Sequence, residues 1–186
     1  MQVFWQGVLT VCCGLMFVAC GAAGDDSSSL QAIGGIYKTG LHLVNSDNCS
    51  DDGTNYADNP MNGAVVWHDA YFKMKEGFME NEWELEWCPD ATGNGCSFSL
   101  FSVRRSSQGW YKENVQSGGQ SGFDCTNSKR TQSAALLDDG HLRLEYRIFS
   151  QNVPEGSSEC NLDAAKALEG NEYCGGYEVI VGSPVE

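Results

Sequence analysis

Nine cysteines fall into two groups along this chain of 186 residues. Cys12, Cys13 and Cys20 lie in an N-terminal stretch that has no charged side chain before Asp25. The second group is spread through the rest of the chain and consists of Cys49, Cys88, Cys96, Cys125, Cys160 and Cys174. So many cysteines in a chain long enough for one ordinary domain indicate an oxidising compartment, where disulfides form and persist.

The first group of cysteines lies in a segment with the features of an export signal. The apolar run 8–19 has the length of the hydrophobic part of a secretory signal peptide. The motif Phe17-Val18-Ala19-Cys20 follows at its end and resembles the lipobox of bacterial lipoprotein precursors. The resemblance implies cleavage before Cys20 and transfer of a diacylglycerol to its thiol.

This segment predicts three parts: a signal peptide (1–19), a lipidated flexible tether (20–32) and a single β-rich domain (33–186). Gly21 stands after Cys20 in place of aspartate, which in Gram-negative lipoproteins is compatible with transfer to the outer membrane. We therefore expect an exported protein, anchored by its lipid at the periplasmic or surface face of a bacterial membrane. The leader lacks Lys and Arg, so an uncleaved anchor and ordinary cleaved secretion stay open.

Removal of the leader and acylation of Cys20 leave six cysteines, an even number that makes three disulfides. Zinc is disfavoured because these six include no CxxC motif and none has a histidine at zinc-finger spacing. Six cysteines allow about fifteen connectivities, and sequence cannot select among them. Local spacing suggests Cys88–Cys96 and Cys160–Cys174, with Cys49–Cys125 left by default.

Two-residue alternation of apolar and polar side chains dominates from Ile33 onward and predicts half-buried strands. Asp139-Gly140 is a strong hairpin turn between two of these strands. Asn161 can cap one short helix at 162–169, with Leu162, Ala165 and Leu168 facing the protein. We expect strands at 36–45, 64–74, 82–87, 97–104, 109–115, 132–137, 141–148 and 177–181.

About eight short strands and one short helix near the C-terminus predict a mainly β domain, a single antiparallel barrel or sandwich stapled by disulfides. The order of the elements resembles the meander barrel of lipocalins, and this resemblance favours a barrel.

The composition and motifs exclude several classes of function. A formal charge of −14 argues against nucleic acid as a partner, because phosphates need basic side chains. No GxSxG nucleophile motif and no P-loop occur, and no cysteine is left for a Cys-His pair after three disulfides. His42, His68 and His141 fit structural or solvent-facing roles in strands. We therefore predict no catalytic residue, no cofactor and no enzyme activity.

Two groups of residues could bind a ligand. The acidic loop from Asp47 to Asp58 offers oxygen ligands of the kind that calcium prefers, but its spacing fails as an EF-hand, so we assign no metal ligand. Aromatic side chains on neighbouring strands either line a cup for an apolar ligand or fill the core. These side chains are Trp67, Tyr71, Trp83, Trp87, Phe98 and Trp110.

The sequence thus predicts a membrane-anchored envelope lipoprotein whose biochemical activity it does not specify. The alternatives are a β-barrel binding module for a small apolar ligand or a partner protein, and a secreted enzyme without a recognisable motif.

Overall fold

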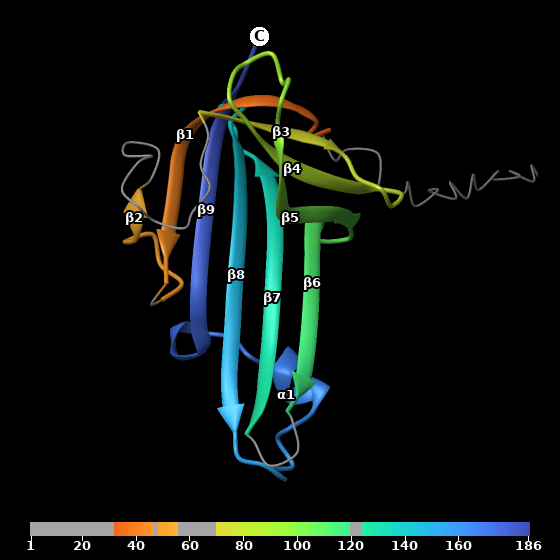
Figure 1. Ribbon diagram of the computed structural model, residues 1–186, viewed down its shortest axis with the longest axis vertical. Coiled ribbons are helices and arrows are strands. Elements are labelled where there is room, and N and C mark those ends of the chain that lie inside the picture. Colours follow the sequence, from red (N-terminus) through yellow and green to blue (C-terminus); the bar gives the residue numbers. More distant parts are fainter. Residues whose placement is uncertain (1–31, 47, 56–69, 120–123) are drawn as a thin grey trace, which may run out of the picture.

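The computed structural model describes residues 32–46, 48–55, 70–119 and 124–186, most of which lie in antiparallel strands. Figure 1 shows the long strands side by side along the longest axis of the molecule. The strands are β1 (Gly35–Asn45), β2 (Thr54–Asn55), β3 (Tyr71–Glu76), β4 (Glu82–Cys88), β5 (Ser97–Ser106), β6 (Gly109–Gly118), β7 (Cys125–Leu136), β8 (Leu142–Val153) and β9 (Cys174–Pro184). Two helices, α1 (Leu162–Lys166) and the 3₁₀ helix η2 (Asn171–Tyr173), precede β9.

The eight strands β1 and β3–β9 form a closed antiparallel barrel. From β3 to β9 each strand pairs with the next, and β9 returns to pair with β1 between Tyr37↔Pro184 and Asn45↔Tyr177. The short β2 pairs with the far end of β1, opposite Leu43 and Val44. The predicted mainly β barrel is confirmed over the sandwich alternative, and closure removes the unpaired edges that an open sheet would expose.

Strand alternation places a large apolar core inside the barrel. In β4, Leu85 and Trp87 are buried while the side chains of Glu84 and Glu86 remain half-exposed. The inner face is tightly filled, because a Cβ atom on Gly182 would lie 2.4 Å from a ring carbon of Phe72. The core consists of Ile33, Tyr37, Phe72, Met74, Leu85, Trp87, Phe101, Val103, Trp110, Ala134, Leu142, Leu144 and Ile180.

The aromatic residues expected on neighbouring strands largely belong to this core. Trp87 and Trp110 are buried, and Trp83 packs edge-to-face on Trp110 with ring centroids 6.2 Å apart. Tyr71 is half-buried and Phe98 is exposed. Trp67 lies outside the described residues. The core therefore accounts for three of the expected aromatic residues, with Trp87 and Trp110 inside it and Trp83 packed against it, and these do not line a cup for an apolar ligand.

Two segments cover parts of the outer face. Leu43, Tyr177 and Val179 form a second apolar cluster with the disulfide-bonded Cys49 and Cys174. Farther along the molecule, α1 packs on β6 and β7 (Figure 1). Among the described residues, no helix has both the length and the apolar character needed to cross a membrane.

All six cysteines of the described domain form disulfides. Cys88–Cys96 is confirmed, whereas the other two predicted pairs are wrong. Cys174 is the first residue of β9, which pairs with β1, and it therefore lies close to Cys49 in the loop after β1. Cys125 is the first residue of β7, and Cys160 lies just before α1, which packs on β7. The two bonds that replace the predicted pairs are Cys49–Cys174 and Cys125–Cys160.

Several element boundaries differ from those expected. β7 begins at Cys125, seven residues before the predicted 132, because its polar first half pairs with both β6 and β8. Asn161 caps α1 by accepting a hydrogen bond from the Ala164 N–H, as expected, but the helix ends at Lys166. Ala165 is buried as expected, whereas Leu162 is exposed. The part of the predicted strand 64–74 before residue 70 lies outside the described residues.

Candidate binding groove on the outer face

A groove with a volume of about 560 Å³ lies on the outer face of β6, β7 and β8. Its walls are mostly polar side chains that alternate with the buried core residues of the same strands. For example, Ala134 and Leu144 point into the core, whereas the intervening positions face outward. The lining residues are Gln108, Tyr111, Glu113, Lys129, Thr131, Ser133, Glu145, Arg147, Phe149 and Glu169.

The strand register arranges the lining in rows. Tyr111, Ser133 and Glu145 are direct neighbours across β6, β7 and β8. Two residues farther along, Glu113, Thr131 and Arg147 form the next row. Directly opposed residues on antiparallel strands have Cβ atoms about 4.5–5.5 Å apart, so each row presents a continuous strip of functional groups.

Lys129 closes one end of the groove. Its side chain is only 6% exposed, and its Nζ donates to the main-chain oxygen of Lys166 at 2.9 Å. The same Nζ lies 3.3 Å from an Oε1 of Glu169 and 5.6 Å from the centroid of the Phe149 ring. The ammonium group therefore connects β7 to the end of α1 and lies over the ring of Phe149.

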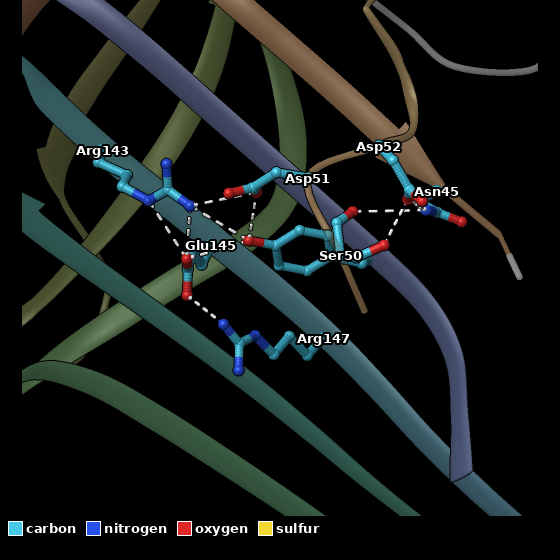
Figure 2. Close-up of polar contacts among 8 residues, drawn as sticks. Asn45, Ser50, Asp51, Asp52, Arg143, Glu145 and Arg147 are labelled. Carbon is cyan, nitrogen blue, oxygen red and sulfur yellow. Dashed lines mark hydrogen bonds and ion pairs between the residues drawn. The ribbon is translucent and has the colours of Figure 1, made fainter. Parts of the chain in front are cut away.

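The opposite side of the groove carries a network of ion pairs (Figure 2). Glu145 lies between two arginines of β8: its Oε1 accepts from Arg143 Nη2 at 2.8 Å and its Oε2 accepts from Arg147 Nη2 at 3.1 Å. Arg143 Nη2 also lies 3.5 Å from Asp51. The buried Nε of Arg147 has no hydrogen-bond partner among the described residues. The network fixes the carboxylate of Glu145 at the wall of the groove.

Tyr177 extends this network, and Tyr111 makes a separate hydrogen bond to Glu113. The hydroxyl of Tyr177 donates to Asp51 at 2.9 Å and accepts from Arg143 at 3.1 Å. Burial and then the hydrogen bond to Asp51 raise the pKa of Tyr177 to about 12. Tyr111 donates to Glu113 at 3.0 Å, and burial followed by this bond raises its pKa to about 12. Both hydroxyls remain protonated donors at neutral pH.

Apart from Asp51, the acidic loop after β1 bonds its polar side chains within the loop or to Asn45. The Asn45 amide donates to Asn48 Oδ1 at 2.8 Å and to Asp52 Oδ1 at 2.7 Å, and Ser50 donates to both of these oxygens. Figure 2 shows the contacts among Asn45, Ser50 and Asp52. Within residues 32–46, 48–55, 70–119 and 124–186, no cluster of three His, Cys, Asp or Glu side chains could hold a metal ion. Asp47 and Asp58 lie outside those ranges.

The histidines do not contribute to the groove. His42 is fully buried, donates from Nε2 to Glu178 Oε1 at 2.7 Å, and stacks on Trp87 with ring centroids 5.0 Å apart. His141 lies beside Asp139 at the β7–β8 turn, 2.9 Å from its carboxylate. His68 lies outside the described residues. The two described histidines are thus accounted for by local packing and ion pairing.

Sequence reasoning identified part of this surface but not the groove. The alternation in 141–148 places Arg143, Glu145 and Arg147 on one polar face, as found. The alternation does not place Lys129 or Thr131 on this surface, because the predicted strand begins at 132 and both residues precede it. The run from Thr126 to Gln132 is polar throughout, without an alternation of apolar and polar residues, and such a run is equally typical of a loop.

No family model, no curated protein and no solved structure matches this chain.

Proposed function

We propose that this protein is an exported lipoprotein, anchored to a bacterial membrane through a lipid on Cys20. The observation that carries the proposal is the pairing of all six later cysteines in three disulfides. If residues 1–19 are removed as a signal peptide, Cys20 is the single cysteine that these bonds do not use. Three disulfides also favour an oxidising compartment on the far side of the bacterial inner membrane.

Metabolic labelling with a fatty acid tests the anchor. The full chain, expressed in a bacterium with a lipoprotein pathway, should incorporate labelled palmitate and partition into the membrane fraction. Cys20→Ser should lose the label, whereas Cys12→Ser, which removes a thiol of the leader, should keep it. Label retained by Cys20→Ser would contradict the proposal.

A second proposed function, that of a binding module, rests on the groove. Its lining favours a hydrophilic ligand rather than the apolar ligand that the aromatic strands suggested. Tyr111, Thr131 and Ser133 present hydroxyl groups along the lining of the groove. The volume of the groove lies within the range of small-molecule sites, and convergent polar groups of this kind fix the orientation of a ligand.

The charges in the groove favour a ligand without net charge. Lys129 and Arg147 face three carboxylates, those of Glu113, Glu145 and Glu169. A strongly anionic ligand would meet these carboxylates, and a strongly cationic one would meet the two cations. A hydroxyl-rich ligand such as an oligosaccharide satisfies both donors and acceptors and can stack on the ring of Tyr111.

Calorimetric titration with soluble oligosaccharides of graded length tests this second function. Thr131→Trp places a large ring in the groove and should abolish the binding heat. Thr126→Trp is the matched control, because Thr126 lies on the same strand, exposed and bonded to Asn152 outside the groove. Equal binding heat in both variants, or no heat with the unsubstituted protein, would exclude the groove as a saccharide site.

A further inference from the structure

The turn between β3 and β4 exposes two large apolar side chains. Phe78 is 98% exposed and Met79 is 53% exposed. The turn is held by main-chain hydrogen bonds from Gly77 to Glu82 at 2.8 Å and from Glu82 to Met79 at 3.1 Å. A third bond, from the Arg105 N–H to the Asn81 carbonyl at 3.1 Å, ties the turn to β5. The two side chains are therefore presented by a fixed tip.

A hollow of about 530 Å³ lies behind this tip. Phe78 and Met79 form one side of it, and Trp83 and Trp110 form the other. Both indoles carry an apolar body and a polar N–H, a combination that is enriched at the boundary between lipid and water. The tip and hollow together form an amphipathic end of the barrel.

The chain enters the barrel at the same place. Ala32 lines the hollow together with the tip residues, and Gly34 lies against the ring of Trp83. Cys20 precedes Ala32 by twelve residues (32 − 20) in the sequence. Twelve residues span at most about 40 Å when fully extended. A lipid on Cys20 thus keeps the tip within reach of the bilayer.

We propose that Phe78 and Met79 insert into the surface of the bilayer that holds the anchor, so that the barrel sits on the membrane at its β3–β4 end. This inference rests on the proposed lipid on Cys20. A single acylated tether leaves a domain free to tumble, whereas a second apolar contact orients it. In Figure 1 the β3–β4 hairpin projects away from the long strands and α1 lies toward their far end, so this orientation keeps α1 away from the lipid.

The charges around the tip select the type of membrane surface. Glu76 and Glu80 flank the apolar tip. Arg105 lines the same hollow, and Arg104 Nη2 contacts the sulfur of Met79. Groups of both signs therefore surround the tip, and headgroups that carry both signs can pair with each of them. The contact therefore fits a zwitterionic lipid surface better than an anionic one.

Quenching of tryptophan emission by brominated acyl chains tests the contact. The lipidated full chain is reconstituted in phosphatidylcholine vesicles, with Phe78→Trp as the reporter. Leu162→Trp is the control, since Leu162 is another exposed apolar residue (53%) but lies on α1. After subtraction of the emission of the unsubstituted protein, we expect brominated lipid to remove most of the added emission of Phe78→Trp and little of that of Leu162→Trp.

The outcomes separate this inference from the function on which it rests. Palmitate-labelled protein in which both reporters are quenched equally, or neither is quenched, would overturn the tip contact and leave the anchor in place. A chain without palmitate label would refute the anchor itself. Quenching of Phe78→Trp that weakens when phosphatidylglycerol replaces part of the phosphatidylcholine would support the preference for a zwitterionic surface.

Discussion

At the scale of single residues, the groove depends on charged and polar side chains that are largely buried. Lys129 is the clearest case, because an ammonium group in a site this enclosed is stable only with partners of its own. The main-chain oxygen of Lys166 and the carboxylate of Glu169 supply them. The four-carbon stem meanwhile packs under α1, where a shorter side chain would leave a void.

Replacement of Lys129 should therefore weaken the attachment of α1. Lys129→Met keeps the length of the stem but loses the bond to Lys166, and we expect the free energy of unfolding to fall by about 1–3 kcal/mol. Lys38→Met, at an exposed position of β1, should change it by less than about 0.5 kcal/mol. Urea denaturation followed by circular dichroism measures both. Equal urea midpoints for the two variants would mean that the bond from Lys129 to Lys166 does not stabilise the folded protein.

Tyr177 links the acidic loop to β8 and makes stability depend on alkaline pH. Its pKa is raised from 10.0 to about 12 in the folded protein. Because the folded state holds the proton more tightly, this contribution to stability is complete below pH 10 and is lost as the pH rises towards 12.

Tyr177→Phe should thus be less stable than the unsubstituted protein at neutral pH, since it loses the bond to Asp51. Its stability should also decline less steeply between about pH 10 and about pH 12. Thermal unfolding across this range is the measurement, with Tyr173→Phe as a control at a position for which no such network is seen. Parallel declines for all three proteins would contradict the role assigned to Tyr177.

At the scale of elements, neighbouring strands of the barrel differ in how many residues they pair. β7 and β8 are paired over twelve positions, whereas β5 and β6 are paired over three. Beyond those three pairs, Lys112 of β6 reaches Glu82 of β4 at 2.9 Å and also contacts Ser102 of β5. Side chains thus connect the strands where the main-chain ladder ends.

Glu82→Gln tests this side-chain link. The hydrogen bond from Lys112 lowers the pKa of Glu82, so its contribution is complete above the ordinary value of 4.5 and is lost as the pH falls through the lower folded value. We expect a loss of about 1–3 kcal/mol at neutral pH. The difference from the unsubstituted protein should shrink in acid. Glu80→Gln, in the exposed turn, should match the unsubstituted protein in urea denaturation at both pH values.

The strands themselves show how far local sequence determines an element. The alternation of Trp and Leu with Glu in 82–87 corresponds to β4, and Asp139-Gly140 forms the turn between β7 and β8. The first half of β7 could not be found in this way. Its Asn127 and Lys129 are buried under the segment around α1, so the polar residues that argue for a loop are in fact enclosed.

At the scale of the whole molecule, the three disulfides close loops of very different length. The sequence separations are 125 for Cys49–Cys174, 35 for Cys125–Cys160 and 8 for Cys88–Cys96. In the chain-entropy account, a longer closed loop removes more freedom from the unfolded chain. The long bond also fixes the acidic loop on the outer face, next to Tyr177.

Removal of each disulfide by paired Cys→Ala substitutions should follow that order. We expect losses of about 5 kcal/mol for Cys49–Cys174, about 4 kcal/mol for Cys125–Cys160 and about 2.5 kcal/mol for Cys88–Cys96. Denaturant midpoints of the three double variants measure the series. The same loss for all three would show that folded-state contacts, rather than loop length, dominate.

The sequence by itself determined the features that depend on neighbours along the chain: the alternating strands, the Asn161 cap, the β7–β8 turn and an even number of cysteines for three bonds. The tertiary structure alone decided which cysteines pair, which polar residues line the groove and where the chain enters relative to the β3–β4 tip. The physical reason is closure of the barrel. The pairing of β1 with β9 joins residues more than a hundred positions apart, as in Cys49–Cys174, and no local pattern records a contact of that range.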